Sequence, residues 1–344
     1  MIERLIWDQE VAGLNPVSST KLPHHLKKCL LICISLDIYA DMQKQQIKSP
    51  HPYFGSKRRI VSDIWARLGD VENYIEPFAG SLSVLLGCPI ISKIETANDY
   101  DCFIPNFWRA VQADANEVAK YADYPVLEAD LHARHRWLIS PAADEFRKQM
   151  SLNPNYYDAK IAGWWVWGMN ASIGITFCKQ RGLECKPFLS MIGQGITTPG
   201  VDVLSWFKIL QERTKKVRVC CGSWERVCTP PCTYKNKSLS KNGMVGVFLD
   251  PPYLVENRED KLYRIETNIF NDVCVWAMEN ASHPKMRIAV CGYDGDYPFP
   301  SNWERFYWRT TGGFSSLAKD KERGKENSKK ETIWFSPNCI IGKV

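Results

Sequence analysis

The feature that most constrains the fold is an apolar strand that stops at a pair of prolines. The stretch GVFLDPPYLVENR, residues 246–258, runs from three apolar residues into an acid, two prolines and a tyrosine. Proline has no backbone N–H, so Pro251 and Pro252 end the strand. The strand therefore leaves the carboxylate of Asp250 at its tip. In an α/β sheet such a tip faces a ligand crevice; the other interpretation is a rigid turn with Tyr253 on the surface.

The flanking segments alternate between short strands and helices. Apolar spacing and a glycine turn predict a strand, a turn and a helix within 73–87, then a strand over 94–101 that ends on acids, and a helix over 106–122. A similar alternation resumes in MVGVFLDPPY and continues with a helix in 271–280 and strands in 286–294 and 331–339. Alternation of this kind predicts a doubly wound, Rossmann-like α/β sheet.

Three parts of the chain differ in pattern. Residues 1–48 have no clear period and are interpreted as an N-terminal extension, with Met42 as a candidate start of the native chain. Residues 49–124 and 244–344 carry the α/β pattern and are predicted to form one catalytic domain. Residues 125–243 are rich in Trp, Cys, Gly and Pro and interrupt that pattern, which predicts a region inserted between two halves of one sheet.

Composition restricts the class of protein and of partner. The chain has 344 residues and a net charge of +6, which is compatible with a nucleic-acid partner. Its 13 cysteines follow no regular framework and are interpreted as reduced thiols of a cytoplasmic protein. The most apolar early run, 29–40, is too short to span a bilayer and contains Asp37, so no membrane partner is expected.

Two clusters raise the question of a metal, and in both we favour another reading. The first cluster consists of four cysteines that lie close together in the sequence, Cys220, Cys221, Cys228 and Cys232. Their spacing matches no CxxC pair, so a zinc site is disfavoured. The second has no evident acidic or Cys partner and is interpreted as a polar helix face rather than a zinc or nuclease site; it comprises His132, Arg134, His135 and Arg136. No metal site is therefore predicted.

Two further positions carry ligand-binding chemistry. Gly80 and Ser81 lie between a strand and a helix, where small residues let a ligand approach the backbone and helix amides attract a polar group. Taken alone this is more often just a tight turn. Asp99 ends the next strand, where a nucleoside-binding α/β protein places its ribose ligand. On that feature alone, a solvated strand end or a helix N-cap is an equal reading.

The combination is much more specific than its parts. The order PYFGSK (52–57), EPFAG (76–80), NDYD (98–101), an insertion and DPPY (250–253) resembles the alpha-class, Dam-like, adenine-specific DNA methyltransferases. WGMNASIG (167–174) is similar to the Asn-containing segment that precedes the target-recognition region of that family. The resemblance spans roughly residues 50–340; whether the gene belongs to a phage or mobile element is left open.

The resemblance implies roles for individual residues. Tyr53, Lys57, Glu76, Phe78, Gly80 and Asp99 would bind S-adenosyl-L-methionine, with Asp99 on its ribose. Asp250 would also border the cofactor, and Asp250, Pro251, Pro252 and Tyr253 would form the catalytic motif. The sequence departs from the usual pattern of the family at several positions. Ser56 replaces the second glycine of the upstream motif, and Tyr53 stands where a tryptophan is usual. In the cofactor turn, Ser81-Leu82-Ser83 stands where the family has a second small, glycine-like residue.

The implied activity is methyl transfer to the exocyclic amino group of a flipped-out adenine in double-stranded DNA. Asp250 and the carbonyl of Pro251 would accept the amino hydrogens, and Tyr253 would stack on the base. A cognate restriction endonuclease is a further partner that such an enzyme can have. Two alternatives stay open: an amino-methyltransferase acting on cytosine or RNA, and an inactive DNA-binding protein with the same fold.

Overall fold

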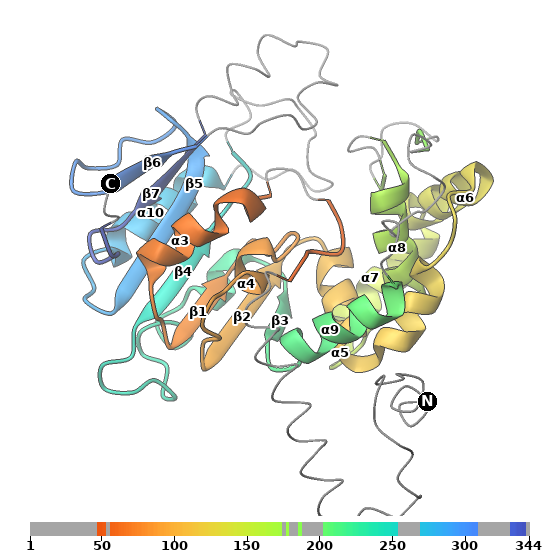
Figure 1. Ribbon diagram of the computed structural model, residues 1–344, viewed down its shortest axis with the longest axis horizontal. Helices are drawn as coiled ribbons and strands as arrows, with labels where there is room; N and C mark the ends of the chain where they lie inside the picture. The colour runs from red at the N-terminus through yellow and green to blue at the C-terminus, as the bar shows by residue number, and fades with distance from the viewer. Residues whose placement is uncertain are drawn as a thin grey trace, which may run out of the picture. The chain divides into compact units, whose positions relative to one another are not determined.

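The computed structural model describes residues 47–52, 56–173, 177–178, 185–187, 202–253, 269–308 and 331–341. Seven strands form one sheet in the order β3-β2-β1-β4-β5-β7-β6 (Figure 1). The strands are β1 (Asn73–Glu76), β2 (Ile94–Asp99), β3 (Arg218–Cys221), β4 (Val245–Leu249), β5 (Met286–Tyr293), β6 (Glu304–Tyr307) and β7 (Glu331–Phe335).

The first five strands of this order run parallel, and the last two pair antiparallel. Parallel ladders join β3 to β2, β2 to β1, β1 to β4 and β4 to β5. β7 is antiparallel to both β5 and β6. Because the strand order reverses between β1 and β4, the carboxyl ends of these two strands flank the crevice in which an α/β sheet binds its ligand.

Helices cover both faces of the sheet, and the central strands are accordingly buried along their whole length. Every residue of β1, β4 and β7 is buried. The 3-10 helix η1 (Arg58–Ile60), α3 (Val61–Leu68) and α4 (Ser83–Leu86) lie on the side that faces the viewer in Figure 1, and α10 (Phe270–Asn280) lies behind. The sequence prediction of a mixed, Rossmann-like α/β sheet is confirmed.

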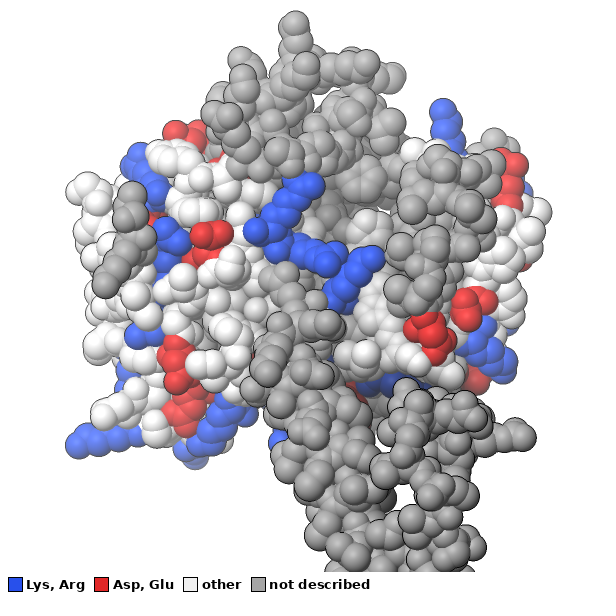
Figure 2. Space-filling model, in the orientation of Figure 1, with Lys and Arg blue, Asp and Glu red and all other residues white. Residues whose placement is uncertain are grey.

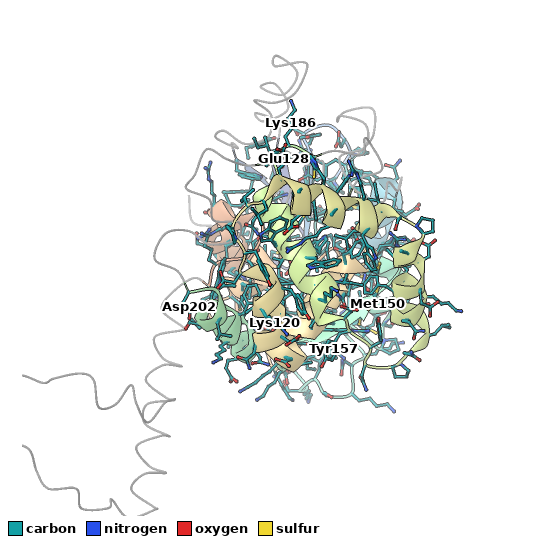
Figure 3. The ribbon with its side chains drawn as sticks, turned by 90° about the vertical axis from the view of Figure 1, so that its right-hand side faces the viewer. Lys120, Glu128, Met150, Tyr157, Lys186 and Asp202 are labelled. Atoms are coloured by element: carbon teal, nitrogen blue, oxygen red, sulfur yellow. The ribbon has the colours of Figure 1, made fainter. Side chains whose placement is uncertain are left out.

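A helical part adjoins the β2–β3 end of the sheet. It consists of α5 (Phe103–Ala122), α6 (Glu128–Ile139), α7 (Ala142–Leu152), α8 (Ala159–Ala171) and α9 (Val203–Thr214). α5 packs against α8 and α9 and also contacts β2 and β3, so it links the helices to the sheet. Figure 3 shows this part facing the viewer, with Lys120 of α5, Glu128 at the start of α6 and Asp202 before α9 labelled.

The predicted insertion of residues 125–243 needs a correction at its end. β3 lies within that range and pairs with β2 in the main sheet, so the chain returns to the sheet at Arg218 rather than at residue 244. The short strand RVCC carries two of the cysteines considered as zinc ligands, and its polar first residue hides its strand character from a pattern based on apolar runs. β6 was not predicted from the sequence either.

The interpretation of 132–136 as a polar helix face is wrong for its two central residues. The guanidinium of Arg134 is buried and lies 4.2 Å from the ring centroid of Trp167. His135 is fully buried, and its Nδ1 accepts a hydrogen bond from the backbone N–H of Cys178 at 3.1 Å. Both side chains hold α6 to the rest of the helical part. In the described part of the chain, no group of three or more His, Cys, Asp or Glu is placed to hold a metal ion.

Candidate functional site

A cavity of about 240 Å³ opens at the carboxyl ends of the parallel strands. Four strand ends contribute to its wall: the turn after β1, the end of β2, the loop after β3 and the DPP segment after β4. Strands far apart in sequence thus bring their ends to one edge of the sheet, as the parallel ladders require. The predicted site residues that line it are Lys57, Glu76, Phe78, Gly80, Asp99, Asp250 and Pro252.

The turn after β1 contains a glycine in a left-handed conformation and is held by several hydrogen bonds. Gly80 has φ of +44°, in the left-handed region that favours glycine, and its N–H donates to Asp99 Oδ2 at 3.0 Å. The N–H of Ala79 donates to the carbonyl of Asn98 at 2.8 Å, and the Asn98 amide donates to Pro77 and Gly222 carbonyls at 3.0 and 2.9 Å. The turn is therefore fastened to the ends of β2 and β3 before any ligand binds.

Asp99 serves as the fastening point of two backbone segments. Its Oδ2 accepts from Gly80 and its Oδ1 accepts from the N–H of Asp101 at 2.9 Å. Asp99 is buried yet lines the cavity. A carboxylate that faces a cavity is the type of group that accepts hydrogen bonds from hydroxyls of a ligand. The two readings left open by the sequence, ligand-binding acid and local cap, are compatible in this geometry.

Glu76 is a buried carboxyl group at the end of β1. Its Oε2 accepts from the hydroxyl of Tyr74 and from the N–H of Leu85, each at 3.2 Å. Burial raises the pKa of Glu76 to about 8, although both hydrogen bonds favour the ionised form. At neutral pH the group is therefore mostly protonated, and a positive charge placed in the cavity would favour its ionisation.

Lys57 and Asp250 form a buried ion pair beside the cavity. Lys57 Nζ lies 2.9 Å from both carboxylate oxygens of Asp250, although 193 positions separate the two residues. The Lys57 side chain is 1% exposed and that of Asp250 is 22% exposed. Burial would lower the pKa of Lys57, but the negative charges of Asp250 and Glu331 outweigh it and keep that pKa above its usual value. Lys57 therefore stays charged and orients Asp250.

Tyr253 lies deeper than the sequence suggested. It is 5% exposed and is not among the residues that line the cavity. Its ring packs edge-on against Tyr293 with centroids 4.8 Å apart, and its hydroxyl donates to Glu331 Oε2 at 3.0 Å. Pro251 is buried as well. The stacking role expected for Tyr253 stays a prediction, and Tyr53 lies outside the described residues.

Sequence reasoning missed two parts of the site. The loop after β3 brings Ser223, Trp224 and Glu225 to the cavity, within the stretch predicted as insertion. The ring of Trp224 lies 6.2 Å from that of Phe78. The second missed part is a single residue, Glu331, at the start of β7. An acid at a strand end was the signal used for Asp99 and Asp250, but Glu331 begins its strand instead of ending it.

The described residues contain no helix of the length and apolarity needed to cross a membrane. A comparison with curated proteins gave no match. Residues 53–151 match the sequence model of the D12 class N6 adenine-specific DNA methyltransferases, and this stretch includes the turn after β1 and the acid at the end of β2. Over these residues the chain is similar to this enzyme family, and the match supports the resemblance to the Dam-like adenine methylases.

Proposed function

We propose that the protein transfers a methyl group from S-adenosyl-L-methionine to the exocyclic amino group of adenine in double-stranded DNA. The observation that carries the proposal is the cavity in which the glycine turn, Asp99 and the Lys57–Asp250 pair share one wall. It joins a place for a nucleoside cofactor to an oriented carboxylate that can accept amino hydrogens. The family match to adenine-specific DNA methyltransferases supports the same activity.

The residues of the cavity fit such a cofactor. Gly80 has no side chain that would cover the turn, and Asp99 places a carboxylate, the type of group that binds ribose hydroxyls, in the cavity wall. Two buried polar atoms on lining residues, Trp224 Nε1 and Asn98 Oδ1, have no hydrogen-bond partner within the described structure. Buried polar atoms without partners cost free energy, which a bound ligand with matching groups would recover. Glu76, Phe78 and Lys57 complete the cofactor-binding set that we propose.

When bound in this cavity, S-adenosyl-L-methionine would supply an electrophilic methyl group. Asp250, held by Lys57, accepts a hydrogen bond from the amino group of the base, and the carbonyl of Pro251 accepts the other. These contacts orient the nitrogen lone pair toward the methyl group, and such alignment supplies much of the rate. Pro252 stiffens the turn, and Tyr253 stacks on the base in this proposal. Because the amino group is inaccessible inside a duplex, the base must leave the stack at a cost of a few kcal/mol.

Contacts to DNA are proposed for the inserted helical region and for basic residues beside the cavity. The segments 47–52 and 56–60, orange-red in Figure 1, carry the exposed Lys48, Arg58 and Arg59. Figure 2 shows Lys and Arg side chains gathered in the middle of the face, between the sheet and the helical part. Phosphate groups of DNA would bind there, and such binding would weaken as salt rises.

The decisive experiment incubates the protein with labelled S-adenosylmethionine in three separate reactions, which contain unmethylated duplex DNA, single-stranded DNA or RNA. The expected result is label in adenine of the duplex. Label in cytosine or RNA would replace the proposed substrate by that alternative. Cofactor binding without transfer to any nucleic acid would favour an inactive DNA-binding protein. Sequencing of modified bases in a host that expresses the protein would then define the recognition site.

A further inference from the structure

Glu331 places a second carboxyl group next to the Lys57–Asp250 pair. It is the first residue of β7, lies opposite Tyr293 of β5, and is 6% exposed. No step described so far uses it. A buried acid beside a buried ion pair costs free energy unless it is hydrogen-bonded, and the contacts of Glu331 therefore show which groups it serves.

The hydroxyl of Tyr253 connects the two carboxyl groups. It donates to Glu331 Oε2 at 3.0 Å and lies 3.3 Å from Asp250 Oδ1. A phenol carries one proton and can also accept a hydrogen bond. When Asp250 carries a proton, Tyr253 can accept it while its own proton goes to Glu331. The three groups therefore form a continuous path along which a proton can move away from the cavity.

The charges along the path favour movement in that direction. Lys57 holds its proton, because the pKa of its ammonium is raised, and so it cannot act as the acceptor. Burial raises the pKa of Glu331; nearby Asp250 and Asp296 raise it further, while Lys57 and the hydrogen bond from Tyr253 oppose the shift. The buried thiol of Cys291 on β5 also lies in this field, and burial raises its pKa. Glu331 is thus the acid on the path whose protonation burial favours.

We propose that Glu331 is the final acceptor of the proton that the amino group loses when it is methylated. The methylated nitrogen carries one proton too many. The N–H electron pair returns to nitrogen as the proton passes to Asp250 Oδ1. Asp250 passes a proton to the Tyr253 oxygen as the Tyr253 hydroxyl gives its own to Glu331 Oε2. Asp250 and Tyr253 end unchanged, and Glu331 ends neutral and releases its proton to solvent before the next turnover. The inference rests on the proposed function.

The first test compares the full-length variants Glu331→Gln and Glu304→Gln. An amide at position 331 can still accept the Tyr253 hydrogen bond but cannot take a proton. We expect kcat of Glu331→Gln to fall about 100-fold at pH 7, with little change in KM for DNA or in cofactor Kd. Glu304 is the matched control, because it lies on β6, the strand next to β7, pairs with Arg67 of α3 at 2.6 Å and does not line the cavity. Its variant should keep the wild-type kcat.

The pH profile separates proton transfer from a structural role. In the wild type, kcat should fall on the acidic side as Glu331 becomes protonated and can no longer accept. This acidic limb should move or disappear in Glu331→Gln. Tyr253→Phe should lower kcat by a similar factor, and the double variant should be no worse than either single one, because both break one path. A wild-type kcat and unchanged limb in Glu331→Gln would overturn the proposal.

Infrared difference spectroscopy gives a readout that does not depend on activity. The wild type should show a carboxylic acid C=O band that titrates above the usual glutamic acid range and is missing in Glu331→Gln; no difference between the two would also overturn the proposal. If the wild type methylates adenine while Glu331→Gln is indistinguishable from it, only the proton path is wrong. If the wild type methylates no nucleic acid, the proposed function itself is wrong.

Discussion

Two buried ion pairs in this protein differ in their surroundings: one borders the cavity, and the other lies between a helix and the sheet. Lys57 and Asp250 meet beside the cavity, and the carboxylate remains 22% exposed. Arg213 of α9 and Glu95 of β2 meet between a helix and the sheet, with side chains 4% and 3% exposed. In the second pair, both guanidinium nitrogens contact the carboxylate, at 2.7 and 2.8 Å, and one also donates to the carbonyl of Leu85.

The difference teaches that burial and pairing alone do not identify a site. The guanidinium of Arg213 contacts both carboxylate oxygens of Glu95 and the carbonyl of Leu85. Neither residue of this pair lines the cavity. The pair connects the helical part to the sheet. In the Lys57–Asp250 pair, the lysine holds a carboxylate at the rim of the cavity, where oxygen lone pairs of Asp250 remain available for a ligand. The Arg213–Glu95 pair should therefore govern stability, and the Lys57–Asp250 pair should govern activity.

The largest expected effect is the loss of methyl transfer in Asp250→Asn. The amide cannot form the charged hydrogen bond to the amino group, and kcat should fall about 10²- to 10³-fold. Cofactor Kd should change much less, as measured by calorimetry on the same preparation. Asp250→Ala should also abolish transfer, but it leaves the Lys57 charge buried without its partner and should lower stability as well. Activity that persists in both variants would refute the assignment of Asp250.

The second effect breaks the other pair. Glu95→Ala leaves the guanidinium of Arg213 buried without a carboxylate and should lower the free energy of unfolding by about 3–5 kcal/mol. Urea unfolding measures this loss, and kcat per folded molecule should stay close to wild type. The double change Glu95→Leu with Arg213→Met should recover most of the stability, since apolar side chains can replace a buried pair. A large loss of kcat in the folded double variant would contradict a purely structural role.

A third, smaller effect concerns the acid at the end of β2. Asp99→Asn should raise cofactor Kd about 10- to 150-fold, because a hydrogen bond to a charged group contributes about 1.5–3 kcal/mol. Asp202 provides the control: it caps α9 by accepting from the N–H groups of Leu204 and Ser205, and it does not line the cavity. Equal cofactor affinity in Asp99→Asn and Asp202→Asn would leave Asp99 as a local cap only.

The last effect is a pH dependence of stability that comes from Glu76. Its pKa is raised from 4.5 to about 8, so the native state keeps a proton that the unfolded chain loses. The stabilisation is fully present below about pH 4.5 and is lost as pH rises through about 8. Glu76→Gln should remove this part of the slope in urea unfolding between pH 5 and 9. An unchanged slope would mean that Glu76 is ionised in the native protein.

Local sequence patterns were sufficient for the elements that build the sheet centre. Short strand patterns ending on an acid or a glycine turn predicted β1, β2, β4 and β5, because each strand end is specified within a few residues. The same patterns missed β3 and β6. Their strands are four residues long with exposed or half-buried positions, so apolar character does not distinguish them from loops. Missing β3 placed the insertion boundary too late and hid Trp224 from the predicted site.

The sequence by itself determined which residue types stand at strand ends, and through their order it indicated a methyltransferase of this family. Only the tertiary structure decided which of them meet. Lys57 reaches Asp250 across 193 positions, and Glu331 reaches Tyr253 across 78. Neither pairing leaves a local trace, because a contact between distant segments depends on strand order and register. The parallel order β3-β2-β1-β4 brings four strand ends to one edge, and the antiparallel β7 brings a strand start to the same place.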